Sequence, residues 1–273
     1  MAKKKSVLVI GAVGPLGSYL TDEVERHGYR VKTLIWNARR PANLPPSVMK
    51  LEGKLDQVST LTLPLSFVDG MIIISGENKN MGNLPMEIDF ASLKNLVLGL
   101  DGRKIPTVLL TSADGLEASN NHITPQAYFE MRISEILVHS SGLPYTIIRM
   151  YNAFPGLARH RHFVASPVEN PDRTTRRHSL SCRQVGDIAA RCLFNPEAHG
   201  KSFELFADDE GETADADEFI KSIPGDEITP EACFEAGKSW VEPDLINDIF
   251  FTRENLNRSH SRAPVEINLE DAN

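Results

Sequence analysis

Short apolar runs alternate with amphipathic stretches along roughly the first 150 residues of the chain. The apolar runs are rich in β-branched residues and predict six strands, at residues 7–10, 29–36, 47–51, 71–75, 106–111 and 145–149. Apolar residues at helical spacing predict helices at residues 15–27, 88–100 and 125–141. Strands and helices that alternate at short spacing are typical of a parallel sheet with helices on both faces. We therefore expect an α/β fold built on a doubly wound parallel sheet.

The alternation of apolar runs and amphipathic stretches becomes less regular after about residue 151. In this part of the chain, the pattern predicts strands at residues 179–180 and 201–206 and helices at residues 187–194, 217–223 and 244–251. Asp187 is a candidate N-cap for the first of these helices, because a short polar side chain can accept from the free amides at a helix start. The last dozen residues, from about Ser261, are polar and are expected to fray.

Charge and cysteine content narrow the function classes. The formal net charge is -8 at pH 7, which argues against a general binder of nucleic acid or of membrane surfaces. The apolar run at residues 7–10 is too short for a signal-peptide core or a membrane span. Cys182, Cys192 and Cys233 form no C-x-x-C pair, so neither a disulfide framework nor a zinc site is indicated. We expect a cytoplasmic protein with reduced thiols.

A glycine-rich loop joins the first predicted strand to the first predicted helix. Gly11 allows the tight turn, Gly14 lets the backbone approach a diphosphate, and Gly17 lets the helix pack close to the sheet. The start of the helix offers free amides and a positive dipole end to the phosphates. We therefore predict a Rossmann-type site for NADP or NAD, whose phosphate contacts are Gly11, Val13, Gly14, Pro15, Leu16 and Gly17. The alternative is a glycine turn that serves packing only.

The end of the second predicted strand bears on the choice of cofactor. The segment Ile35-Trp-Asn-Ala-Arg-Arg40 holds no acid that would bind the ribose hydroxyls of NAD. Arg39 and Arg40 can meet a 2′-phosphate, and Trp36 or Asn37 can contact the adenine ribose, so NADP is favoured over NAD. The alternative for the arginines is an exposed loop. Ser75 and Met150, at the ends of the fourth and sixth strands, complete the candidate cofactor contacts.

Four further segments form a recognisable set. They are Val108-Leu-Leu-Thr-Ser112, Tyr128-x-x-x-Arg132-x-x-Glu135 with the run from Gly142 to Arg149 behind it, Val185-Gly-Asp-Ile-Ala189, and Gly200 to Leu205. Together with the glycine loop, they resemble atypical short-chain dehydrogenases/reductases of the NmrA-like, NAD(P)H-binding type, over about residues 6–206. The sequence departs from that family at several positions. Val13 stands in place of Thr, Trp36 in place of a basic residue, Lys54 in place of an acid, and Arg132 in place of the active-site Lys.

The resemblance implies a Rossmann domain with a small C-terminal substrate lobe over the cleft. We expect an NAD(P)-binding domain at residues 1–155, a smaller substrate lobe at 156–260 that is interleaved with the sheet, and a flexible tail at 261–273. Members of the family include reductases of small carbonyl or alkene compounds. Other members only bind the nucleotide and act as redox sensors or regulators.

The same resemblance points to candidate catalytic residues. Tyr128 would donate a proton to the developing alkoxide, Arg132 on the same helix face would supply the positive charge, and Ser112 would orient the substrate carbonyl. Arginine is larger than lysine and has a different geometry, so it is not an equivalent replacement. The alternative is a structural role for all three.

Residues that follow the sixth strand are candidates for the substrate pocket. Tyr151 and Phe154 could wall an apolar pocket, and Asn152 could bind a carboxamide or a substrate oxygen; ordinary packing is the alternative. Arginines and histidines gather in residues 149–183, either as a lid that attracts an anion or as a loop that pairs with the acidic segment 208–218. The pair His160 and His162 has no acid or thiol nearby, so no metal is expected.

These observations lead to three hypotheses for function. The first is an NADPH-dependent reductase, an oxidoreductase of a small or medium, possibly aromatic, organic substrate. The second is a non-catalytic NAD(P) sensor or regulator that binds a protein partner. The third is a non-redox enzyme, an isomerase or cyclase, on the same fold. We expect a small-molecule substrate, no nucleic-acid or membrane partner, and either a monomer or a dimer.

Overall fold

The structure is a computed structural model and describes residues 3–12, 15–35, 44–75, 88–112, 125–150, 153–154, 162–167, 180–208 and 215–227. The predicted helix at 244–251, the predicted tail at 261–273 and Cys233 lie outside these ranges.

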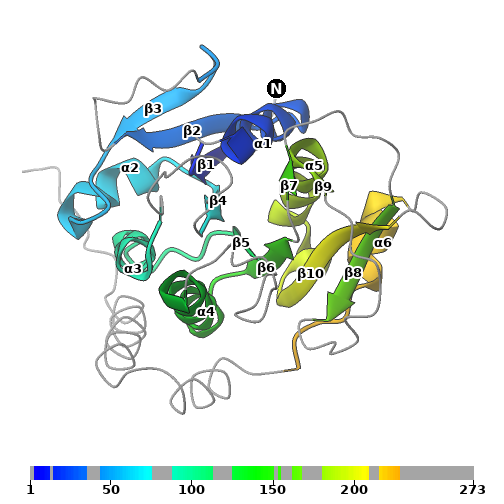
Figure 1. The fold of residues 1–273 in the computed structure, drawn as a ribbon. Coiled ribbons are helices and arrows are strands. Elements are labelled where there is room, and N and C mark those ends of the chain that lie inside the picture. The colour runs from blue at the N-terminus through cyan, green and yellow to red at the C-terminus, as the bar shows by residue number, and fades with distance from the viewer. Residues whose placement is uncertain are drawn as a thin grey trace, which may run out of the picture.

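An eight-stranded sheet forms the centre of the molecule, in the order β3-β2-β1-β4-β5-β6-β10-β8 (Figure 1). Its strands are β1 Ser6–Ile10, β2 Arg30–Ile35, β3 Met49–Glu52, β4 Gly70–Ile74, β5 Thr107–Ser112, β6 Tyr145–Met150, β8 His162–Pro167 and β10 Lys201–Asp208. All neighbouring pairs are parallel except β10 with β8, which is antiparallel. The predicted Rossmann-type α/β fold is confirmed.

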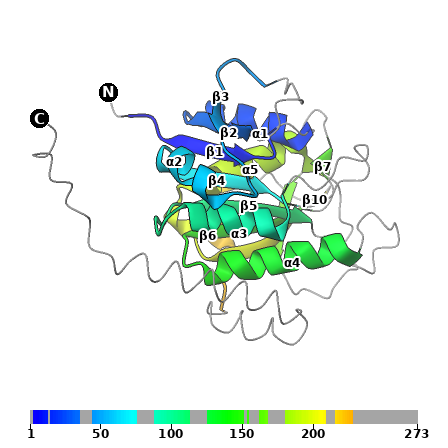
Figure 2. The same ribbon diagram turned by 90° about the vertical axis from the view of Figure 1, so that its left-hand side faces the viewer.

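Helices cover both faces of this sheet (Figure 2). They are α1 Pro15–Arg26, α2 Thr62–Ser66, α3 Phe90–Gly99, α4 Pro125–Ser140, α5 Cys182–Leu193 and α6 Ala216–Ser222, with short 3-10 turns at Val58–Thr60 and Pro196–Ala198. One apolar cluster joins α2, α3 and α4 to one face, and a second joins α1, α5 and α6 to the other. A separate two-stranded sheet pairs β7 Ala153–Phe154 with β9 Leu180–Ser181.

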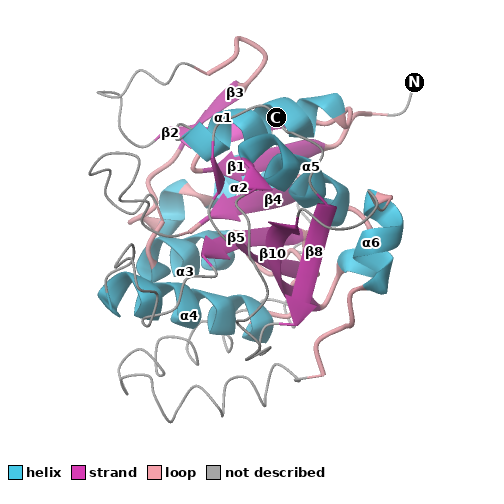
Figure 3. Cartoon of the chain, turned by 45° about the vertical axis from the view of Figure 1, so that its right-hand side comes forward, coloured by secondary structure: helices cyan, strands magenta, loops and turns pink. Residues whose placement is uncertain are grey.

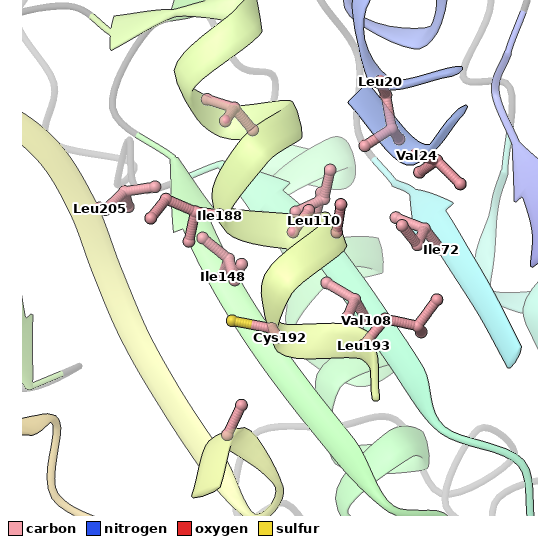
Figure 4. Close-up of a cluster of buried hydrophobic side chains, with 14 of the residues drawn as sticks. Leu20, Val24, Ile72, Val108, Leu110, Ile148, Ile188, Cys192, Leu193 and Leu205 are labelled. Atoms are coloured by element: carbon pink, nitrogen blue, oxygen red, sulfur yellow. The ribbon is translucent and has the colours of Figure 1, made fainter. Parts of the chain in front are cut away.

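Strand residues alternate between these two clusters. In β5, Leu109 belongs to the α3 and α4 side, whereas Val108 and Leu110 belong to the α1 and α5 side. Figure 4 shows the second cluster, in which Ile188 of α5 lies over the sheet beside Leu110 and Ile148. A strand with apolar residues on both faces has no polar side, which explains why the continuous apolar runs of the sequence were good predictors of strands.

The start of α5 differs from the prediction. Ser181, and not Asp187, is the N-cap, and it forms a capping box with Gln184: the Gln184 amide donates to the Ser181 hydroxyl, and the Ser181 amide donates to the Gln184 side chain. Asp187 lies in the middle of the helix and accepts from Arg191, one turn later. The expectation for Asp187 was therefore wrong, because the N-cap of a complete capping box lies six residues earlier and starts the helix there.

Helices α1 and α5 pack side by side and are joined by polar contacts. Glu23 accepts from Arg183 at 2.7 Å, and His27 Nε2 lies 2.7 Å from Asp187 Oδ1. A Cβ at Gly186 would lie only 3.1 Å from Glu23 Cγ, so this glycine permits the close approach of the two helices. The helix that follows the glycine loop is thus fixed by a helix from the second half of the chain.

The second half of the chain completes the sheet. β10 pairs with β6 and extends the parallel order, and the unpredicted strand β8 pairs with β10 at the edge beside α6 (Figure 3). Residues 180–208, which the sequence assigned to the smaller lobe, therefore supply one strand and one helix to the central layers. The division at residues 155 and 260 stays a prediction. Within the described part of the chain, no helix is long and apolar enough to cross a membrane.

The two cysteines of α5 yield a prediction about thiol reactivity. Cys182 and Cys192 are free and buried, and burial raises the pKa of Cys182 to about 11 and that of Cys192 to about 12. A thiol that stays protonated and shielded is a poor nucleophile. In a Cys233→Ser background, we expect the folded protein to resist an aromatic disulfide reagent at neutral pH, and both thiols to react after denaturation. Rapid labelling of the folded variant would contradict the observed burial.

Candidate dinucleotide-binding site

The turn after β1 is built for close packing of backbone against backbone. Gly11 has a φ of 89°, in the left-handed region that favours glycine. A Cβ at Gly17, in the first turn of α1, would overlap the Gly11 carbonyl oxygen and lie 2.6 Å from the Ala12 Cα. Both glycines are therefore needed for α1 to begin directly beside the end of β1, which is the geometry of a phosphate-binding turn.

The start of α1 lies at the carboxyl end of β1, as the sequence predicts. Pro15 is the first residue of the helix, where its missing amide costs no hydrogen bond, and Leu16 packs against the apolar cluster below α1. Val13 and Gly14 lie outside the described residues, as does the whole adenosine segment with Trp36, Asn37, Arg39 and Arg40. Their predicted contacts stay predictions.

Three candidate residues come together at the carboxyl ends of neighbouring strands. Ser112 ends β5 and is in register with Met150, which ends β6, and Ser75 follows β4 on the other side of β5. Ser75 is buried, and its hydroxyl donates to the Ile88 carbonyl at 3.4 Å. This edge is also where β1 ends and α1 begins, so these candidates share one edge of the sheet with the glycine turn. Clefts of doubly wound sheets open at this edge.

Arg132 lies behind this edge in a buried charge network. Its Nη1 donates to Glu135 at 3.0 Å, and its Nη2 donates to the Ser112 carbonyl at 2.7 Å. Glu135 also accepts from Arg149 Nη2 at 2.6 Å and from the Thr111 hydroxyl at 2.8 Å. The carboxylate thus joins α4 to the ends of β5 and β6, and Arg132 holds the backbone of Ser112.

The network keeps Glu135 ionised despite its burial. Burial alone would raise the pKa of this carboxyl, but the charges of Arg132 and Arg149 and the hydrogen bonds from Arg149 and Thr111 outweigh it and lower the pKa. The buried carboxylate lies between two guanidinium groups and a hydroxyl donor, so its negative charge is well compensated. Sequence reasoning missed this role of Glu135. The available signal was its spacing of three residues from Arg132 on one helix face.

Other candidates are only partly described. Tyr128 belongs to α4, one turn before Arg132, but its side chain lies outside the described part, and so do Tyr151 and Asn152. Phe154 is half-exposed on β7. Of the basic segment, Arg149 pairs with Glu135 and Arg183 pairs with Glu23, so neither of these two joins the acidic segment 208–218.

Glu23, His27 and Asp187 are the metal-ligand types that come together among the described residues. Their ligand atoms lie within 4.8 Å of one another at the contact of α1 with α5. Arg183 bonds to Glu23 and Arg191 bonds to Asp187, so arginines already neutralise both carboxylates. The cluster is an ion-pair network between two helices. His160 lies outside the described residues, and the side chain of His162 does as well.

Comparison with known proteins gives distant relatives and a shared fold. No protein-family model matches the chain. The photosystem II assembly factor Ycf39 of Cyanophora paradoxa is 26% identical over 224 residues, which cover 81% of this chain and 69% of that protein. Protein TIC 62, chloroplastic, of Pisum sativum is 26% identical over 254 residues, which cover 80% of this chain and 46% of that protein. The chain thus spans less than half the length of the pea protein.

Solved structures share the arrangement of strands and helices. The oxidoreductase YlbE of Lactococcus lactis superimposes with a TM-score of 0.60 at 17% identity, over 80% of this chain and 95% of that one. A short-chain dehydrogenase/reductase of Veillonella parvula in complex with NADP superimposes with a TM-score of 0.58 at 14% identity, over 78% of this chain and 98% of that one. These structures share the Rossmann-type fold that the resemblance to atypical short-chain dehydrogenases/reductases implies.

The atypical short-chain dehydrogenase/reductase pattern makes Arg132 the most informative departure. Where the family has a lysine, this chain has a guanidinium whose two terminal nitrogens contact Glu135 and the Ser112 carbonyl. A lysine has one compact ammonium in place of the planar fork whose two nitrogens reach these two acceptors separately. In this chain, the position of the family's catalytic cation is thus part of the scaffold between α4 and β5.

Proposed function

We propose that this chain binds NADP at the carboxyl edge of its sheet and uses the bound nucleotide as a regulatory signal rather than as a source of hydride. Support for binding comes from the turn at Gly11 and Gly17, where backbone and helix start meet without room for a side chain. Support for NADP comes from Arg39 and Arg40 and the absence of an acid at the end of β2.

The observation that carries the regulatory part is the network of Arg132. Proton donation by Tyr128 would need a nearby cation that lowers the tyrosine pKa and binds the nicotinamide ribose. Arg132 is only 10% exposed, and its two terminal nitrogens donate to Glu135 and to the Ser112 carbonyl. It shares the Glu135 carboxylate with Arg149. A cation that is buried against a carboxylate is a weak electrostatic partner for a tyrosine one turn away. Bound nucleotide would then be retained without turnover.

A relative with a known role supports such a function. Ycf39 is a photosystem II assembly factor, so a protein with this degree of similarity can act in the assembly of other proteins. By analogy, the nucleotide-bound form of this chain would recognise a protein partner.

Calorimetry with NADP, NADPH, NAD and NADH tests the binding. We expect NADP to bind more tightly than NAD, and the Arg39→Ser/Arg40→Ser double variant to weaken NADP about 10- to 100-fold, because two charged hydrogen bonds to the 2′-phosphate are lost. NAD affinity should change far less. Arg30→Ser, an exposed arginine at the opposite end of the same strand, is the matched control. Equal losses for NADP and NAD in the double variant would contradict the assignment of the 2′-phosphate site.

An assay of NADPH oxidation distinguishes the regulatory proposal from a reductase. We expect no oxidation above background with a panel of carbonyl and alkene compounds, in a sample that binds NADPH. The reductase is the second candidate, and it is favoured by Ser112 at the end of β5 and Tyr128 on the adjoining helix. NADPH consumption that depends on substrate and is abolished in Tyr128→Phe would establish the reductase and overturn the regulatory proposal.

A further inference from the structure

β3 lies at the end of the sheet order, with β2 on one side (Figure 1). Within the described residues, no strand pairs with its outer side. An edge strand presents a row of backbone donors and acceptors that can pair with another chain, and proteins usually protect such edges with charges, bulges or a covering segment. The residues around β3 therefore indicate whether this edge is protected or available for pairing with another chain.

Exposed apolar side chains gather beside this edge. Among the described residues, four large hydrophobic side chains are exposed, and three of them lie here: Met49 of β3 at 54%, Leu63 of α2 at 69%, and Phe67 at the end of α2 at 58%. The fourth, Phe154, lies on β7. We call Met49, Leu63 and Phe67 the edge patch.

Contacts around Lys32 connect the members of the edge patch. Met49 is in register with Lys32 of the neighbouring strand, so their side chains share a face of the sheet. The Lys32 ammonium donates to the Phe67 carbonyl at 2.6 Å and lies 5.8 Å from the centre of the Phe67 ring. Leu63 is four residues before Phe67, one turn earlier. The patch therefore adjoins the open strand on the α2 side, where cover by another molecule would bury it.

The charges of β3 are complementary to those of a second β3. The strand reads Met49-Lys-Leu-Glu52, and both Lys50 and Glu52 are exposed. When two copies pair antiparallel with Leu51 opposite Leu51, each Lys50 lies opposite Glu52 of the other copy, so two opposite-charge pairs form. A shift of one residue in either direction would place each charge opposite an uncharged position. Opposite-charge cross-strand pairs favour a register, and like charges oppose it.

We propose that two copies of this chain pair through β3 in antiparallel fashion, with Leu51 on the two-fold axis. The same surface serves both copies, as a two-fold interface requires. The axis runs perpendicular to the sheet, so the sheets of the two copies join into one and their edge patches lie on the same face. Self-complementary charge is the feature that selects a second copy over an unrelated partner.

Analytical ultracentrifugation of the full chain with charge variants tests the proposal. The native chain is expected to show a concentration-dependent dimer. Lys50→Glu and Glu52→Lys each turn two attractions into two repulsions and should weaken the dimer about 10- to 30-fold. The Lys50→Glu/Glu52→Lys double variant restores complementarity and should restore the dimer. Lys54→Glu, just beyond the strand and exposed, has the same charge change as Lys50→Glu and should leave the dimer unchanged.

A second variant addresses the edge patch. Leu63→Lys adds a charge to a side chain that is 69% exposed, so the fold should tolerate it, and the dimer should weaken with no loss of thermal stability of the monomer. The proposal is overturned if the native chain stays monomeric over the whole range of concentrations. It is also overturned if Lys50→Glu and Lys54→Glu behave alike, or if the double variant fails to recover the dimer, since another surface would then be responsible.

Discussion

The Glu135→Gln variant is expected to lose about 3 to 5 kcal/mol of unfolding free energy, because the substitution leaves two buried guanidinium groups opposite a neutral amide. Arg132 and Arg149 both donate to this carboxylate, which also accepts from the Thr111 hydroxyl. Glutamine keeps the volume of the side chain, so the change isolates the charge. Denaturant unfolding followed by circular dichroism measures the effect.

Glu218→Gln, an exposed change on α6, is the control and should alter stability by less than about 0.5 kcal/mol. The effect of Glu135 should also depend on pH. Its pKa is lowered in the folded state, so its contribution is complete above the unfolded value of about 4.3 and is lost as the pH falls through the folded value. The gap between native and variant should therefore shrink in acid. A gap that stayed constant, or a variant as stable as the native chain at neutral pH, would show that the carboxylate is not ionised in this cluster.

Gly17→Ala is expected to weaken NADP binding by about 100-fold or more, because the new methyl group cannot share space with the turn that holds the phosphates. Its Cβ would overlap the Gly11 carbonyl oxygen and lie 2.6 Å from Ala12 Cα. Both neighbours are backbone atoms, so α1 must move away from the turn. The amides at its start then no longer point toward the position of the phosphates. The same displacement should destabilise the fold by about 3 kcal/mol. Calorimetry at a temperature where the variant is folded separates the two effects.

Gly28→Ala is the matched control for this variant. Gly28 ends the same helix with a φ of 85°, and nothing lies within 4 Å of a Cβ built there. The change should cost about 1 kcal/mol of stability from the left-handed backbone and leave NADP affinity unchanged. If Gly17→Ala bound NADP as well as Gly28→Ala does, the turn would not be the phosphate site, and the proposed function would fall with it.

The sequence predicted the central strands well because they are buried on both faces. The run at 7–10 contains no polar position, and the run at 71–75 contains one only at its last residue, Ser75; the two runs correspond to Ser6–Ile10 and Gly70–Ile74. Proline and glycine gave the helix limits: Pro15 starts α1, and Gly142, in the left-handed region, follows the end of α4. Local rules suffice where one residue decides the backbone.

Features that depend on distant partners were not predictable in the same way. β8 is a strand because its backbone pairs with β10. The paired residues lie 36 positions apart for Pro167 and Phe203 and 46 apart for His162 and Asp208, and no pattern within residues 162–167 requires this pairing. The start of α5 was missed because two cap signals compete, and the complete one at Ser181 prevails over Asp187.

In the candidate site too, local features were predictable from the sequence and contacts between distant residues were not. Gly11 and Gly17 could be assigned from their spacing, since a phosphate turn is a local structure. Glu135 of α4 contacts Thr111 of β5, 24 positions earlier, and Arg149 of β6, 14 positions later. The spacing of Tyr128 and Arg132 indicated a shared helix face. It did not reveal that Arg132 would donate to a carboxylate on the same helix.

The packing of α1 against α5 has a consequence for synthesis of the protein on the ribosome. His27 meets Asp187, a partner 160 positions later, and the same helix pair covers Leu20 and Val24. A nascent chain emerges N-terminus first, so the first helix waits uncovered until nearly two hundred residues have been translated. During that interval its apolar stripe is available to chaperones, and the nascent chain should acquire affinity for nucleotide only after α5 has left the exit tunnel.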